Sequence, residues 1–279
     1  MTFLLNLITA AVLYGTPLLY GTSGEILTEK SGNLNLGVEG MMFMGGALGL
    51  GAAFYYEKLA GAAVSAPLAV VIAIAASFLA GALAALLFSF LTITLRANQN
   101  VTGLTLTIFG GGVANFFGGT LNSMAGGVGQ YIGEFMRVRE GTYVAVSNTL
   151  KGAFNGSPFP VFLQELPVVG RLLFSHSIFT YLGIAMAVAM GLYLHRSRSG
   201  LYLRAVGESP ATADAAGISV TRCKYLATVI GGGISAIGGM VYIMTVVGGV
   251  WNHEGLSGVG WLAVALVIFC LWSPYRAIW

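Results

Sequence analysis

The chain has 279 residues, of which 56% are hydrophobic and only 8% are charged, whereas roughly a quarter of an ordinary soluble domain is charged. Its 13 Lys and Arg and 10 Asp and Glu residues are too few to cover the surface of a soluble fold. This composition excludes a soluble enzyme, a nucleic-acid-binding module and a disordered chain. The apolar residues fall in blocks of about twenty or more, the length that crosses a bilayer core. The sequence therefore predicts an all-α, polytopic helical bundle in the cell membrane.

Hydropathy predicts seven spans, or eight if part of a long Gly- and Pro-containing segment re-enters the membrane. In chain order these spans are 3–21, 34–56, 67–95, 101–121, 172–195, 225–248 and 258–279. The third, at about 29 residues, is too long for an upright span, so we expect it to tilt or to extend into a loop. The first lacks a basic n-region and a small-residue cleavage pattern, so we expect a retained helix rather than a signal peptide.

Charge predicts the orientation of the bundle. The loop at about 196–224 carries the chain's entire net charge of +3. Its five cations are Arg196, Arg198, Arg204, Arg222 and Lys224. Loops rich in Lys and Arg stay in the cytoplasm, so we expect this loop to be cytoplasmic, the segment 122–171 to be extracellular and the N-terminus to lie outside. Residues 22–33 are expected to form a short polar connector.

Small residues at a spacing of four predict close helix contacts, because lipid gives helices no hydrophobic reason to associate. Such pairs are Gly45 with Gly49, Ser77 with Gly81, and Gly232 with Ala236. They are common in membrane bundles, so they indicate packing rather than an activity.

The catalytic and metal-binding motifs suggested by short stretches of the sequence are incomplete. Gly21-Thr22-Ser23-Gly24 has the form of an intramembrane protease motif, but that chemistry needs a histidine at the same depth, and charges follow the serine at once. His253-Glu254 begins like a zinc motif but lacks the second histidine. No Walker A sequence is present, so ATP hydrolysis is not expected of this chain. We predict no cofactor, no metal and no enzymatic activity.

Two stretches carry more specific signals. Asn35 and Glu39 lie four apart at the start of an apolar run, where ionisable groups usually face a cavity or a partner; the alternative is a helix-end cap in interfacial water. In the basic loop, Ser209 and Pro210 can start a short helix, alanines favour it, and Gly217 can end it. A compact helix with small side chains is a surface that a soluble partner could grip.

Two long segments of the chain resemble the signatures of a known family. Residues 203–220 read LRAVGESPATADAAGISV, which resembles the coupling-loop signature of ABC-importer permeases in the branched-chain amino acid/ribose permease superfamily. Residues 24–42 read GEILTEKSGNLNLGVEGMM, which is similar to the N-terminal signature of the nucleoside and simple-sugar branch. Residues 166–174 and 260–269 also resemble family segments. The likeness is collinear over most of the chain, and members of the family usually continue beyond the position of Trp279.

The resemblance implies a single transmembrane permease domain over 1–279. It implies an assembly of two permease subunits, usually different chains in the nucleoside branch, with ABC ATPase subunits and an external substrate-binding protein. It also implies that a short helix docks in an ATPase cleft. The residues expected there are Glu208, Ser209, Pro210, Ala213, Ala216 and Gly217.

The function predicted is that of a permease subunit moving nucleosides by alternating access. A simple-sugar permease is the alternative within the class, and an ion-coupled secondary transporter, with Glu39 as its only tempting ionisable group, is the alternative outside it. Nucleobases stack on aromatic rings, so Phe116 and Phe117, after Asn115, are candidates for the translocation path together with Asn35 and Glu39. Lipid-facing phenylalanines are the alternative for the two rings.

Overall fold

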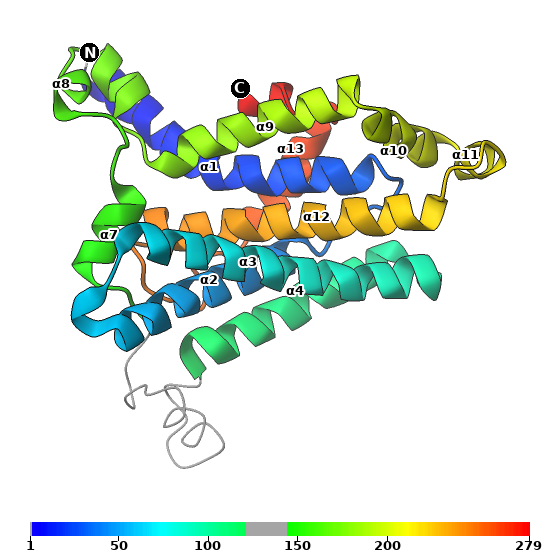
Figure 1. Cartoon of the computed structure of the whole chain (residues 1–279), viewed down its shortest axis with the longest axis horizontal. Coiled ribbons are helices and arrows are strands. Elements are labelled where there is room, and N and C mark those ends of the chain that lie inside the picture. Colours follow the sequence, from blue (N-terminus) through cyan, green and yellow to red (C-terminus); the bar gives the residue numbers. More distant parts are fainter. Residues whose placement is uncertain (1, 121–143) are drawn as a thin grey trace.

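The computed structural model describes residues 2–120 and 144–279, and regular structure in these residues is helical apart from a single bridge between Ala145 and Val250. Six helices are long and apolar enough to cross a membrane, and a shorter apolar helix accompanies them. This confirms the predicted all-α membrane bundle (Figure 1). The helices are α1 (Thr2–Glu29), α2 (Val38–Ala60), α3 (Ala66–Ser89), α4 (Gln99–Asn115), α7 (Asn148–Asn155), α8 (Val161–Gln164), α9 (Ile178–Arg196), α10 (Arg198–Glu208), α11 (Pro210–Ala215), α12 (Val220–Val241) and α13 (Val259–Phe269).

The spans differ from the predicted ones at two places. Helix α1 continues through residues 22–29, which we predicted as part of a connector, because its carboxylates find partners: a Glu25 oxygen accepts the Asn35 N–H at 3.0 Å and Glu29 accepts the Trp272 indole N–H. The last predicted span, 258–279, contains instead the 11-residue α13 followed by turns. The third span is 29 residues long, as predicted, and runs over Ala66–Thr94.

Helix α12 lies at the centre of the bundle, against α1, α2 and α3 (Figure 1). The small residues predicted to mediate packing meet here. A Cβ added at Gly81 would lie 2.3 Å from the Gly232 carbonyl oxygen, and one added at Gly45 would lie 2.3 Å from the Ala236 carbonyl oxygen. The Ser77 hydroxyl donates to that same Ala236 oxygen at 2.8 Å. Small side chains therefore let α2 and α3 approach the backbone of α12 directly.

The connections gather at two ends of the bundle. We call the end formed by residues 30–37, 95–98 and 197–219 the basic end, and it includes α10 and α11, at the right in Figure 1. The Leu34 N–H donates to the Gln99 side chain at 2.9 Å, which joins two of these connections. The described part of the predicted extracellular segment lies at the opposite end, where Leu150 and Phe154 of α7 are fully buried. The first part of that segment, through residue 143, lies outside the described residues.

Candidate coupling surface and interior junction

The short helix predicted in the basic loop is present as α11 (Pro210–Ala215), directly after Ser209. Gly217 has a φ of 81°, a left-handed conformation that favours glycine, and ends the helix. The Gly217 N–H donates to the Asp214 carbonyl at 2.9 Å and the Ile218 N–H to the Ala213 carbonyl at 3.0 Å. These bonds close the last turn of α11 and fix where the chain leaves for α12.

Five of the six residues predicted for docking are exposed. They are Glu208, Ser209, Pro210, Ala216 and Gly217. Ala213 is the exception, because it is only 3% exposed and faces inward. The structure therefore gives α11 one anchoring alanine and an outer surface made mostly of small side chains.

Helix α10 (Arg198–Glu208) seats α11 on the bundle. Its apolar residues Leu203 and Val206 are buried, and Leu203 belongs to a cluster with Ile26 of α1. At the end of α10 the backbones touch, since a Cβ added at Gly207 would lie 2.2 Å from the Lys30 carbonyl oxygen. Helix α10 thus contacts, backbone against backbone, the residues that follow α1.

A polar hollow of about 200 Å³ lies beside this contact. Its lining comes from the end of α1, the end of α10 and the turn after α13, and consists of Glu29, Lys30, Arg204, Gly207, Glu208 and Trp272. Glu208, one of the predicted docking residues, therefore stands where α10 meets the rest of the basic end.

From Lys30 the chain turns back into the bundle through polar contacts. The Asn33 side chain donates to the Thr228 hydroxyl at 3.1 Å, and Asn35, which is fully buried, gives its backbone N–H to Glu25. The Asn35 side-chain oxygen accepts the Gly37 N–H at 3.0 Å. These bonds satisfy a non-helical stretch that would be costly to bury without partners.

Helices α2 and α13 both begin inside the bundle. Gly40, in the first turn of α2, packs against the backbone of Leu106 and Gly110 in the middle of α4. In the first turn of α13, a Cβ added at Gly260 would lie 2.3 Å from the Cα of Glu39. With 11 residues, α13 extends ~16 Å, about half the thickness of a bilayer core. We call this meeting of the two helix starts the interior junction.

Glu39 holds the interior junction together. One carboxylate oxygen accepts the Gly258 N–H at 2.9 Å and the other accepts the Trp261 N–H at 3.2 Å. Glu39 is only 7% exposed, and its two oxygens satisfy backbone amides that the start of α13 leaves without partners in the helix. Neither interpretation of Glu39 from the sequence included this partner, because no local pattern indicates that α13 starts beside α2.

The remaining candidates for the translocation path, Asn115, Phe116 and Phe117, lie away from the interior junction. Asn115 contacts His253 through its side-chain oxygen at 2.9 Å, and the rings of Phe116 and Phe117 meet edge to face at 5.4 Å. Phe117 is 40% exposed. The structure thus places these three residues near the loop before α13, and Asn35 and Glu39 around the interior junction.

Sequence reasoning missed two residues near Asn115. Trp251 and His253 line a hollow of about 410 Å³ together with Val247, Val250 and Asn252. The indole N–H of Trp251 is buried and has no hydrogen-bond partner among the described residues. In the sequence, His253 stands out only as part of an incomplete zinc motif. In the described ranges no group of three or more His, Cys, Asp or Glu side chains could hold a metal ion.

The helices and their apolar surfaces define a multi-pass membrane protein. The chain belongs to the family described as the permease component of branched-chain amino acid transport systems, which matches residues 6–279. It is therefore a permease subunit of the ABC-importer class in the plasma membrane and not itself an enzyme. Membership implies an ABC ATPase and a substrate-binding protein as partners.

Curated relatives match over nearly the whole chain. A putative glucose ABC transporter permease protein of Haloferax volcanii is 34% identical and covers 100% of this chain and 74% of its own length. The guanosine ABC transporter permease protein of Bacillus subtilis is 29% identical, with 98% of this chain and 77% of the relative covered. A nucleoside ABC transporter permease protein of Lactococcus lactis is 28% identical, with 98% and 78% covered. No solved structure matches the chain.

Proposed function

We propose that this chain imports nucleosides, with α10 and α11 as the surface that docks on the partner ATPase. The basic end would then be cytoplasmic, as its positive charge predicts. One observation carries the docking part of the proposal: α11 exposes small side chains to solvent, while the end of α10 touches the Lys30 carbonyl through Gly207. A partner that grips α11 therefore acts directly on the segment leading into the bundle.

The mechanism follows the chain from this contact. Closure of the ATPases upon ATP binding pushes α10 and α11 against Lys30. The segment after Lys30 is tied to α1 by the Asn35–Glu25 bond and leads within a few residues to Glu39, which caps α13. A push at the basic end thereby shifts the starts of α2 and α13 together. In this mechanism Asn35 and Glu39 position the interior junction for alternating access.

The hollow beside Trp251 supports a nucleoside as substrate. Among its lining residues, the Asn252 amide and the His253 ring suit the polar edges of a nucleobase. The Trp251 ring also lines the hollow but is only 2% exposed. Two nucleoside-transport relatives agree with this assignment. A simple sugar is the second candidate for the substrate, because the Haloferax relative is named as a putative glucose permease and the same polar groups would also bind sugar hydroxyls.

The assembly we propose contains a second permease subunit, a different chain, with the translocation path at the interface between the two. Asn115, Phe116 and Phe117 lie toward the opposite end of the bundle from α11, where an external binding protein would deliver substrate. The partly exposed Phe117 is the candidate that could reach such an interface.

An ion-coupled transporter is the alternative of another class. It would need an ionisable group free to bind and release an ion at membrane depth. Glu39 was the candidate, but both of its oxygens accept amides of α13. Family membership also favours ATP as the energy source.

The proposal is tested with the complex reconstituted in vesicles with its ATPase, second permease and binding protein. We expect nucleosides, and not glucose or ribose, to stimulate ATP hydrolysis and to accumulate inside. Ala216→Trp, at the exposed residue that directly follows α11, is expected to abolish both. Ala97→Trp, at another exposed alanine of the basic end, provides the matched control. Stimulation by sugars alone would overturn the substrate, uptake driven by an ion gradient without ATP would overturn the class, and full coupling in Ala216→Trp would overturn the docking surface.

A further inference from the structure

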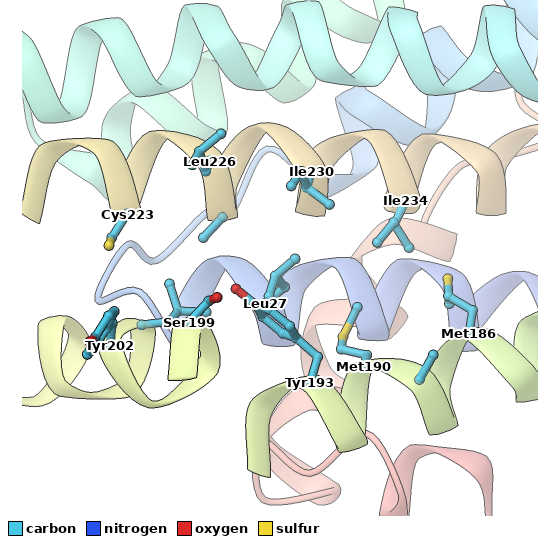
Figure 2. Close-up of a pocket in the computed structure, with 13 residues that line it drawn as sticks. Leu27, Met186, Met190, Tyr193, Ser199, Tyr202, Cys223, Leu226, Ile230 and Ile234 are labelled. Carbon is cyan, nitrogen blue, oxygen red and sulfur yellow. The ribbon is translucent and has the colours of Figure 1, made fainter. Parts of the chain in front are cut away.

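An apolar groove runs along the outside of the bundle between α12 on one side and α9 and α10 on the other, with α1 at its floor (Figure 2). Its volume is about 540 Å³. Its walls are formed mainly by Leu27, Met190, Tyr193, Leu226, Ile230 and Ile234. Leu226 is 63% exposed and Ile230 is 42% exposed, so the described residues leave this apolar surface uncovered.

One end of the groove opens at the basic end, between Ser199, Tyr202 and Cys223 (Figure 2). Arg198 directly precedes Ser199 and Arg222 directly precedes Cys223, and both arginines are exposed. Within the described ranges, neither guanidinium group has an ion pair or a hydrogen bond. Arg198 precedes Tyr202 by four positions on α10, and Arg222 precedes Leu226 by four on α12, so each lies one helical turn before a residue that lines the groove.

We propose that this groove binds an anionic phospholipid, with an acyl chain along α12 and the phosphate between Arg198 and Arg222. The charges at the mouth are complementary to a phosphate, and arginine forms paired hydrogen bonds to phosphate oxygens. Tyr193 and Tyr202 also line the groove, and tyrosine is a residue enriched at the headgroup layer of membranes. The occupant is therefore a molecule with a long apolar part and one anionic end.

The length of the groove fits a lipid of a single leaflet. The positions that line it on α12 run from Cys223 to Ile234, which at 1.5 Å per residue is ~16 Å, about half of the bilayer core. Its walls offer few polar groups to a nucleoside or a sugar. The groove also joins α12, α1 and α10, so a bound lipid would brace the seat of α11 against the bundle.

The test uses the full-length chain in its purified complex, stripped of lipid and then titrated with dioleoyl phosphatidylglycerol or dioleoyl phosphatidylcholine, which share their acyl chains. Native mass spectrometry counts the lipids retained by the permease. We expect phosphatidylglycerol to bind at least tenfold more tightly. Arg198→Gln and Arg222→Gln are each expected to weaken the binding of phosphatidylglycerol about fivefold, because a single cation contributes about that much to the affinity for an anionic lipid.

Matched variants separate the groove from general surface charge. Arg96→Gln removes an exposed cation elsewhere at the basic end and is expected to leave phosphatidylglycerol binding unchanged. Ala189→Trp fills the groove from α9 and is expected to displace the lipid, whereas Val188→Trp, at the neighbouring exposed position outside its lining, is not. Three results would overturn the proposal. The first is equal binding of the two lipids, and the second is an effect of Arg96→Gln as large as that of Arg198→Gln or Arg222→Gln. The third is a crosslink from Cys223 to the second permease in the intact complex. Because lipid binding is read without substrate or ATP, its failure is distinguishable from failure of the transport proposal.

Discussion

Helices α12 and α11 are both rich in small residues, yet they use them in opposite ways. In α12 the glycines and Ala236 face inward, where the backbones of α2 and α3 pack directly against them. In α11 only Ala213 faces inward, and the other alanines face solvent. Small side chains permit close approach in both cases. The comparison shows that α12 uses its small residues for contacts within this chain, whereas the described residues leave most of those in α11 exposed, as the docking we propose requires.

The largest effect is expected from Gly232→Leu in α12. A Cβ at this position would lie 2.4 Å from the Ala85 Cβ and 2.8 Å from the Met41 sulfur, so a leucine cannot fit without separating helices. We expect a loss of more than ~3 kcal/mol, seen as loss of the monodisperse peak in size-exclusion chromatography. The control is Gly51→Leu in α2, because nothing lies within 4 Å of a Cβ there. Similar behaviour of the two variants would contradict the role assigned to α12.

Glu39→Ala is expected to have the next largest effect, because it leaves the amides of Gly258, just before α13, and Trp261, in its first turn, without an acceptor inside the bundle. A hydrogen bond to a charged acceptor contributes about 1.5–3 kcal/mol, so we expect a loss of about 3 kcal/mol, measured as a lower thermal denaturation temperature of the purified protein. Glu39→Gln keeps an acceptor oxygen and should lose about half as much. If the two variants were equally stable, the cap would not be what holds the interior junction.

Gly207→Val tests the contact that joins α10, and with it α11, to the segment after α1. The larger side chain would press on the Lys30 carbonyl, at a cost of about 2 kcal/mol, and α10 would move away from the end of α1. We expect the ATPase to remain bound, as judged by co-purification, while nucleoside transport per ATP hydrolysed falls at least tenfold. Ala205→Val, two positions earlier on α10, serves as a control. Normal coupling in Gly207→Val would show that force does not pass through this contact.

Much of the fold could be predicted from the sequence because it depends on local composition. The spans follow from apolar runs, and α11 follows from Ser209, Pro210 and Gly217, which are start and stop signals within one short segment. The small-residue pairs at Gly81 and Gly232 indicated packing, and the structure shows them packed against one another.

The interior junction could not be predicted, because it depends on contacts distant in the sequence. Glu39 and Gly258 lie 219 positions apart, and nothing near either one indicates the other. Charges at Glu25 and Glu29 suggested that α1 ends early, whereas tertiary partners at Asn35 and Trp272 keep those residues helical. The hollow beside Trp251 was missed for the same reason, since its lining has no motif.

The smallest effect concerns a contact of α1 that uses a large polar side chain instead of small residues. The Tyr20 hydroxyl donates to the Phe179 carbonyl of α9 at 2.9 Å in a buried position. Tyr20→Phe keeps the ring and removes this bond, so we expect a loss of about 1 kcal/mol in thermal denaturation, with normal transport. Tyr14→Phe, at a ring that is 53% exposed, should change neither. A loss as large as that of Gly232→Leu would mean that polar contacts, rather than the close packing of backbones around α12, decide the stability of the bundle.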